Sequence, residues 1–145
     1  MDAPIPGDHR DLATINAVAE AATHTSDVVS AAIFVVDLGS GGLTLAAAAG
    51  IEGEALDRLV SAVHDPTHPI ARTLADQKST FNVTPMAPGG PALRSHVPLV
   101  VERGGWLRTV GVLAVAHDSI VDESEQQTLT DLAAQAASLT AGDGG

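Results

Sequence analysis

The chain has 145 residues, no cysteine and a net charge of −11 at pH 7. The absence of cysteine excludes disulfides, thiolate metal sites, thiol nucleophiles and thioether-linked cofactors. The acidic charge disfavours direct binding to nucleic acid, and no apolar stretch approaches the roughly 20 residues that cross a bilayer. The N-terminal "MDAPIPGDHR" lacks a basic start followed by an apolar run, so we expect no signal peptide and a cytoplasmic location.

The first third of the chain predicts a helix followed by a β-hairpin. Asp8 or Asp11 is placed to cap the helix. Residues 28–37 are rich in β-branched side chains and have no polar face, which is typical of a strand covered on both sides. "LGSGG" then turns the chain into a second apolar run, so residues 29–49 predict an antiparallel hairpin with its first strand central in the sheet.

The middle of the chain predicts short helices and an irregular loop. Apolar positions in residues 52–64 have helical spacing until prolines break the pattern. Pro69 favours a second short helix, in which proline occupies the first turn. "TFNV" predicts a short strand, and residues 84–95, "TPMAPGGPALRS", contain too much proline and glycine for regular structure.

The last third predicts a second hairpin and a closing helix. Residues 94–117 form two apolar runs around a turn at Gly104 and Gly105, and the return run is apolar enough for a central strand. Asp122 and Glu125 have the spacing of a capping box. The helix that follows carries one apolar stripe: Leu129, Leu132, Ala133, Ala136 and Leu139.

This order of elements resembles the GAF domain, a relative of the PAS sensor domains. The resemblance covers nearly the whole chain and is carried by "AAIFVVD", "HPIARTLADQKSTFNV", "RSHVPLVVERGGWLRTVGVLAVAH" and "VDESEQQTLTDLAAQAA". It implies an α+β fold: a curved antiparallel sheet with the terminal helices on one face and the irregular middle on the other, where family members hold ligands. We expect a single domain, residues 1–145, with a core over about 8–140 and flexible tails at both ends.

The resemblance also implies a sensory or dimerising role in signalling, without catalysis. GAF enzymes that reduce free methionine sulfoxide depend on cysteines, and bilin-carrying GAF domains usually attach their pigment through one. The cyclic-nucleotide signature of Asn, Lys, Phe, Asp and Glu is incomplete in "HDSIVDESE", so cyclic nucleotides are unsupported. The alanine-rich composition, with six arginines and one lysine, favours an actinobacterial-type signalling protein.

Haem and metal ions are disfavoured. In the haem-binding GAF domains of actinobacterial redox kinases the axial histidine lies in the loop before the second hairpin, and residues 84–95 contain none. His68 or His96 would reach haem only in a different geometry. His64 and His68 have i, i+4 spacing, but Pro66 interrupts the helix that a metal pair would need. No cofactor is required and no catalytic set is recognisable, so we expect no enzyme.

The predicted ligand site lies between the sheet and residues 51–96. Strand alternation places Arg94 and His96 on the face opposite Ser95 and Val97, where together with Arg72 they can hold an anionic ligand. In the alternative, Arg94 pairs with an acidic neighbour and His96 satisfies a loop carbonyl. The remaining candidates are His68 at the mouth of the second short helix and a set of apolar walls: Phe34, Leu59, Ile70, Phe81, Met86 and Leu93.

Two interpretations of function follow. The first is a non-enzymatic sensory module of a signal-transduction protein that binds a small molecule. The second is a ligand-free interaction domain that forms a homodimer through its first and last helices and relays to a kinase or other output domain. Ala133, Ala136 and Ala137 would permit close approach of helices in such a dimer. Neither interpretation involves nucleic acid or a membrane as a direct partner.

Overall fold

The computed structural model describes residues 7–25, 27–37, 39–84 and 93–141. Over these residues the chain folds as the α+β arrangement that the sequence predicts. Its elements are α1 (Gly7–Thr23), β1 (Val28–Val36), β2 (Leu43–Ala49), α2 (Gly53–Ala62), α3 (Pro69–Asp76), β3 (Thr80–Val83), β4 (Leu93–Arg103), β5 (Trp106–His117) and α4 (Glu123–Ala141).

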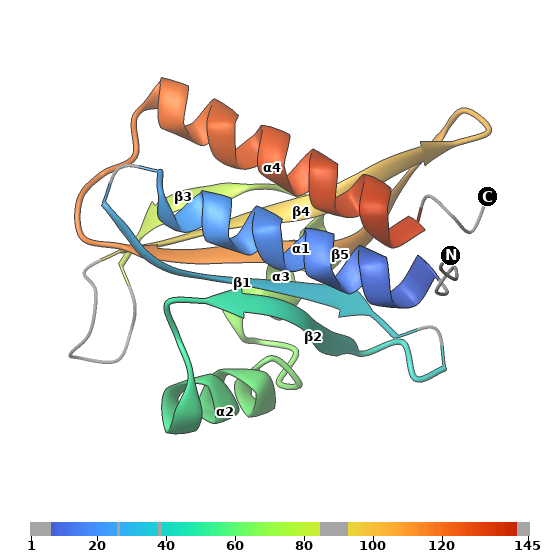
Figure 1. Cartoon of the computed structure of the whole chain (residues 1–145), viewed down its shortest axis with the longest axis horizontal. Coiled ribbons are helices and arrows are strands. Elements are labelled where there is room, and N and C mark those ends of the chain that lie inside the picture. Colours follow the sequence, from blue (N-terminus) through green and yellow to red (C-terminus); the bar gives the residue numbers. More distant parts are fainter. Residues whose placement is uncertain (1–6, 26, 38, 85–92, 142–145) are drawn as a thin grey trace, which may run out of the picture.

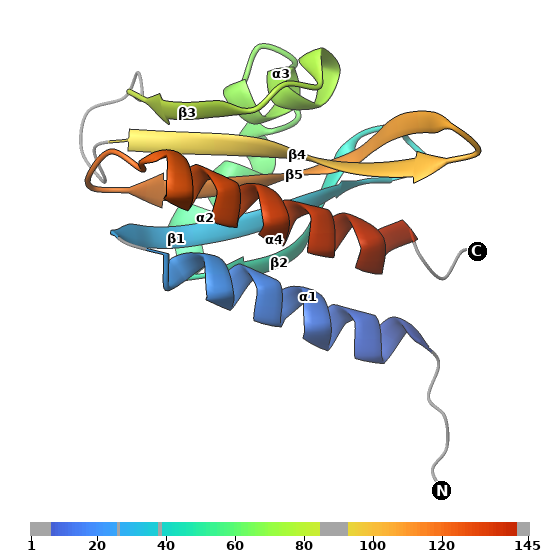
Figure 2. The ribbon, with the colours of Figure 1, turned by 90° about the horizontal axis from the view of Figure 1, so that it is seen from above.

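The strands form one antiparallel sheet in the order β2-β1-β5-β4-β3. The two almost wholly apolar strands, β1 and β5, are central, which confirms the prediction from their composition. Helices α1 and α4 pack side by side on one face of the sheet, and α2 and α3 lie on the other (Figure 1, Figure 2). The sheet therefore separates the terminal helices from the middle of the chain.

The larger core lies between the sheet and the terminal helices. It includes the buried side chains Ile15, Val18, Ala19, Ala22, Ile33, Val97, Leu99, Leu113, Val115, Val121, Leu129, Ala133, Ala136 and Ala137. The small side chains let α4 approach the sheet closely. Ala133, Ala136 and Ala137 are thus used inside the domain, and the expectation that they form a dimer surface is wrong because a helix with one apolar stripe buries it in its own core.

The smaller core lies between the sheet and α2 and α3. Phe34 from β1 and Val112 from β5 are fully buried there, against Val63 and Ile70 from the helical segment. Leu59 of α2 packs against this cluster and is half-buried. Burial of these side chains fixes α3 across the sheet, because apolar area removed from water stabilises the contact by about 25 cal/mol per Å².

Helix ends follow local chemistry, with one correction. The backbone N–H of Glu125 donates to Asp122 Oδ1 at 2.9 Å and that of Asp122 donates to Glu125 Oε1 at 2.8 Å, so the predicted capping box is confirmed. At the other end of the chain α1 begins at Gly7. Asp8 and Asp11 therefore lie inside the helix, and the prediction that one of them is its cap is wrong.

The loop before the second hairpin is shorter than predicted. β4 begins at Leu93, which pairs with His117, and continues through Arg94, which pairs with Ala116. The loop was predicted over residues 84–95 and the hairpin over 94–117, and pairing with the long partner strand draws residues 93–95 into the sheet. Residues 85–92, including Met86, lie outside the described residues.

The β4–β5 hairpin projects beyond the helices (Figure 1). Gly104 and Gly105 form its turn with φ angles of 57° and 87°, as their sequence predicts. Next to the turn, Trp106 is 79% exposed and Leu107 is 72% exposed. Among the described residues, no helix has the length and apolar character to span a membrane.

Candidate functional site

The first component of the site is His68 at the start of α3. Its Nδ1 atom accepts a hydrogen bond from the backbone N–H of Ile70 at 3.1 Å, so His68 is the N-cap, and Pro69 follows where the helix needs no donor. Asp65 orders the preceding turn by accepting from the N–H and hydroxyl of Thr67, and these bonds lower the pKa of its carboxyl. Partial burial lowers the pKa of His68.

The second component is His96 in β4. Its partner across the ladder is Ala114 of the smaller core, so its ring lies on the α3 side of the sheet, as alternation predicts. The side chain is 3% exposed, and its Nδ1 atom lies 3.1 Å from Thr80 Oγ1, with which it shares a hydrogen bond. Burial, reinforced by electrostatic repulsion from the neighbouring His68, Arg94 and His117 when His96 is protonated, lowers the pKa of His96 to about 4.

The third component is Arg94, two residues earlier on the same strand. Its Nη1 donates to the carbonyl of Leu93 at 3.3 Å, and partial burial lowers the pKa of its guanidinium. Strand alternation places Arg94 on the same face as His96, and α3, which His68 caps, packs on that face. We call these three residues the His68–Arg94–His96 cluster. It concentrates nitrogen donors at one point of a strongly acidic protein.

The other predicted site residues divide between the two faces. Phe34, Ile70 and Leu59 belong to the smaller core on the cluster's side, and Leu93 is half-buried at the start of β4. Phe81 packs against the larger core instead, so the sheet separates it from Phe34, and its assignment as a wall of the same site is wrong.

Arg72 differs from the rest of the predicted polar set. It is exposed on α3, and its backbone N–H donates to the carbonyl of His68 at 2.9 Å within the helix. Its guanidinium is therefore less enclosed than that of Arg94. Met86 is in the part of the chain that the structure does not describe.

Two polar arrangements were not predicted. Ser95 Oγ lies 2.8 Å from Nε2 of the buried His117, and it accepts from the backbone N–H of Asn82 at 3.1 Å. The Asn82 side chain bonds both backbone polar groups of Val121. The available signal was Asn82 itself, because asparagine is depleted in strands and tolerates the left-handed conformation that it adopts here, with φ 59°.

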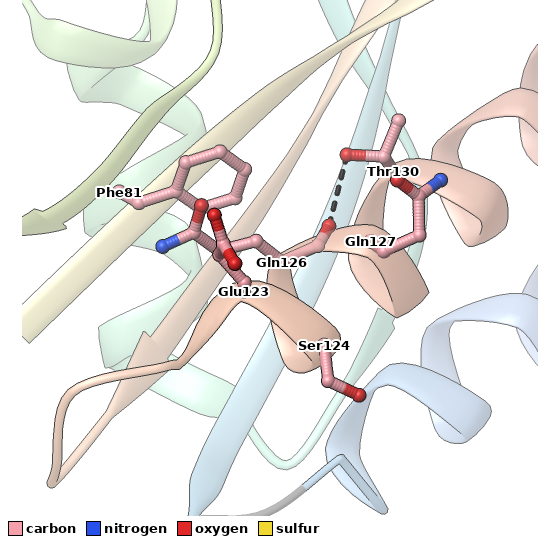
Figure 3. A pocket seen from close by; sticks show the side chains of 6 residues that line it. All are labelled: Phe81, Glu123, Ser124, Gln126, Gln127 and Thr130. Atoms are coloured by element: carbon pink, nitrogen blue, oxygen red, sulfur yellow. Dashed lines mark hydrogen bonds between the residues drawn. The ribbon is translucent and has the colours of Figure 1, made fainter.

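An open depression lies on the α4 side of the sheet (Figure 3). Phe81 forms its apolar wall, and the rest of the lining comes from α4: Glu123, Ser124, Gln126, Gln127 and Thr130. The hydroxyl of Thr130 donates to the backbone carbonyl of Gln126 at 2.9 Å (Figure 3). Within the described ranges, no group of three or more histidine, aspartate or glutamate side chains could hold a metal ion. The His68–Arg94–His96 cluster remains the more enclosed arrangement of ionisable groups.

The chain matches no known protein-family model and no curated protein sequence. Its fold matches solved structures at low identity. A type II free methionine-R-sulfoxide reductase from Thermoplasma acidophilum is 12% identical with a TM-score of 0.72, over 94% of this chain and 96% of that one. The second GAF domain of DevS from Mycobacterium smegmatis is 18% identical with a TM-score of 0.67, over 92% and 96%.

A third match is the GAF domain of a phosphoenolpyruvate-protein phosphotransferase from Acinetobacter, 17% identical with a TM-score of 0.60, over 96% of this chain and 94% of that one. These likenesses show that the chain has the GAF fold, as the residue pattern implied. They leave the activity to be argued from the residues of this chain.

Proposed function

We propose that the chain is a non-enzymatic sensory module of a signal-transduction protein and that it binds a small anionic molecule at the His68–Arg94–His96 cluster. The observation that supports this most is that Arg94 and His96 lie two residues apart on one face of β4, the face covered by α3 with His68 at its N-cap, in a protein of net charge −11. An anion is repelled by such an acidic surface overall, and Arg94 supplies the positive charge of the cluster that attracts it at pH 7.

The cluster favours an anion whose binding is coupled to protonation of His96. Arg94 supplies guanidinium N–H donors, whereas the buried ring of His96 is neutral at pH 7 because its pKa is about 4. A bound carboxylate or phosphate raises that pKa, since an opposite charge favours the imidazolium form. We therefore expect the affinity for the anion to increase as the pH falls.

Packing favours a small ligand. Phe34, Val63 and Ile70 are all buried in the layer between the sheet and the helical segment. The polar groups instead lie at the β3–β4 side of the layer, where His96 contacts Thr80. We therefore propose that the ligand presents a single phosphate or carboxylate group.

We infer that the module performs no catalysis. One matched structure is named as a free methionine-R-sulfoxide reductase. The GAF resemblance implies that enzymes of that kind depend on cysteine. This chain contains no cysteine. The buried pair of Ser95 and His117 does not replace it, because both side chains are closed to a substrate at 0% exposure.

We further infer a cytoplasmic two-component or related pathway, in which an output partner such as a kinase reads the state of the module. Helices α1 and α4 pack together, and the start of α1 and the end of α4 lie at the same end of the domain (Figure 1). A partner at that end could contact both helices at once. The matched structures come from several organisms, so an actinobacterial origin stays a prediction.

The test is a titration with inorganic phosphate, followed by calorimetry and by backbone amide NMR shifts. We expect saturable binding with shifts in β3, β4 and α3, and a loss of roughly tenfold or more in affinity for Arg94→Gln, which removes a charged donor. Arg108→Gln is the matched control, because Arg108 is exposed near the far end of the β4–β5 hairpin. Equal affinities of the two variants would refute the site.

A further inference from the structure

The strand β3 contains a bulge that redirects one of its side chains. Thr80 pairs with His96 and Val83 pairs with Arg94, so three steps along β3 match two steps along β4. The extra residue is accommodated by Asn82, whose φ of 59° is left-handed. Regular alternation would send the Asn82 side chain to the same face as Thr80, but the bulge sends it toward α4.

At its new position Asn82 holds the residue that precedes the capping box of α4. The backbone N–H of Val121 donates to Asn82 Oδ1 at 2.8 Å, and Asn82 Nδ2 donates to the Val121 carbonyl at 3.3 Å. Val121 is 1% exposed, so water does not provide an equivalent partner for these groups. The next residue is Asp122, the cap of α4. We call this pair of bonds the Asn82 clamp.

The opposite side of β3 faces the proposed ligand site. Thr80 Oγ1 shares a hydrogen bond with His96 Nδ1 at 3.1 Å. One short strand is therefore bonded both to a member of the His68–Arg94–His96 cluster and to the start of α4. Thr80 and Asn82 are only two residues apart in the chain.

We propose that the Asn82 clamp couples the His68–Arg94–His96 cluster to α4, so that an anion bound at the cluster changes the stability of the first turn of α4. This inference rests on the proposed function. When an anion favours the imidazolium form of His96, both ring nitrogens become donors and the Thr80 hydroxyl can only accept. The resulting adjustment of β3 reaches Val121 through two hydrogen bonds.

Amide hydrogen exchange in the first turn of α4 tests the coupling. The reporter is the backbone N–H of Gln126, which donates to the Asp122 carbonyl at 2.8 Å. In the wild type, saturating inorganic phosphate should change its exchange rate by roughly tenfold, the effect of one hydrogen bond gained or lost. Asn82→Gly keeps the left-handed backbone and removes the amide, so it should bind phosphate within about twofold of wild type and lose the response.

Gln126→Ala is the matched control. The Gln126 side chain also donates to the Val121 carbonyl, at 3.2 Å, and it lies beside Phe81 of β3 in the open depression rather than in the Asn82 clamp (Figure 3). This variant should keep the phosphate response, whereas general loosening around Val121 would abolish the response in both variants and overturn the inference.

The remaining outcomes separate the inference from the proposed function. Phosphate binding with an equal Gln126 response in wild type and Asn82→Gly would overturn the coupling and leave the ligand site standing. Absence of phosphate binding by the wild type would overturn the proposed function and the coupling with it. If Asn82→Gly does not fold, Asn82→Asp retains the acceptor for the Val121 N–H and lacks the donor. An undiminished response in that variant would overturn the coupling as well.

Discussion

Ser95 Oγ lies 2.8 Å from Nε2 of His117, with which it shares a hydrogen bond, and both side chains are completely buried. His117 Nδ1 lies 2.8 Å from the carbonyl of Ser119, which can only accept, so Nδ1 carries a proton. The Ser95 oxygen in turn accepts from the Asn82 N–H. This chain of bonds joins β3, β4 and the end of β5 on the α4 side of the sheet.

Removal of the Ser95 hydroxyl should destabilise the fold measurably. Ser95→Ala leaves His117 Nε2 and the Asn82 N–H without their partner, and a buried unsatisfied group costs about 1–3 kcal/mol. Urea unfolding followed by far-UV circular dichroism measures the loss. Ser138→Ala, at an exposed position of α4, should stay within about 0.5 kcal/mol of wild type. Equal effects of the two substitutions would show that the buried bond contributes nothing.

His96 should make the fold less stable in acid. Its native pKa of about 4 is below the 6.5 of the unfolded chain, so the unfolded chain binds more protons between these values. The contribution is complete above pH 6.5 and is lost as the pH falls toward 4, by up to about 1.4 kcal/mol per pH unit. His96→Asn retains a polar partner for Thr80 and cannot titrate, so its free energy of unfolding should fall less steeply.

The measurement is a set of urea unfolding curves between pH 7 and the acid limit of the fold. His68 is also shifted downward by burial, but it is present in both proteins, so the difference in slope isolates His96. Parallel stability profiles for wild type and His96→Asn would show that the buried ring is not the group that titrates.

His68 has two roles that substitution can separate. Asp at the N-cap accepts the Ile70 N–H as the imidazole does, so His68→Asp should keep the stability of α3, whereas His68→Ala should lose about 1 kcal/mol. The carboxylate of His68→Asp would repel an anion, and we expect phosphate affinity to fall roughly tenfold. Unfolding curves and phosphate calorimetry on both variants provide the comparison. Unchanged affinity in His68→Asp would remove His68 from the site.

Gly111 is required where β1 and β5 meet. A Cβ atom there would lie 2.1 Å from the Phe34 carbonyl oxygen and 3.0 Å from Val35 Cα, both fixed by the sheet. Gly111→Ala should therefore cost about 3–5 kcal/mol or prevent folding. Gly42→Ala is the control, since its nearest atom would be Ser40 Oγ at 3.5 Å. Thermal unfolding distinguishes them, and a mild effect at Gly111 would mean that the two strands can move apart.

The elements that the sequence predicts correctly depend on neighbouring residues. The capping box of α4 needs only Asp122 and Glu125, three positions apart, and the second hairpin needs only its glycine turn between two apolar runs. The helix α3 likewise starts where Pro69 allows. The GAF resemblance implied that the terminal helices cover one face of the sheet and the middle of the chain covers the other. The packing of the two cores confirms this arrangement.

The elements that were missed depend on pairing between distant residues. "TFNV" contains Asn82, which hints at an irregular backbone, but it does not reveal the bulge, because the extra residue exists only relative to Ser95 on another strand. Alternation would place Phe81 and Asn82 on opposite faces of the sheet, whereas the bulge leaves both side chains on the α4 side. The alanines of α4 were misinterpreted for a related reason: a stripe of small side chains indicates close packing but does not identify the surface that it packs against.

The exposed hairpin tip determines which optical probe reports on this protein. Trp106 is the sole tryptophan of a chain without tyrosine, and it is 79% exposed. Its indole is in contact with water in the folded state, so unfolding changes its fluorescence very little, and a denaturation curve recorded in this way would appear flat while circular dichroism shows the full transition. The same property makes the indole a selective reporter: a blue shift of its emission would mark the moment at which another molecule covers the tip.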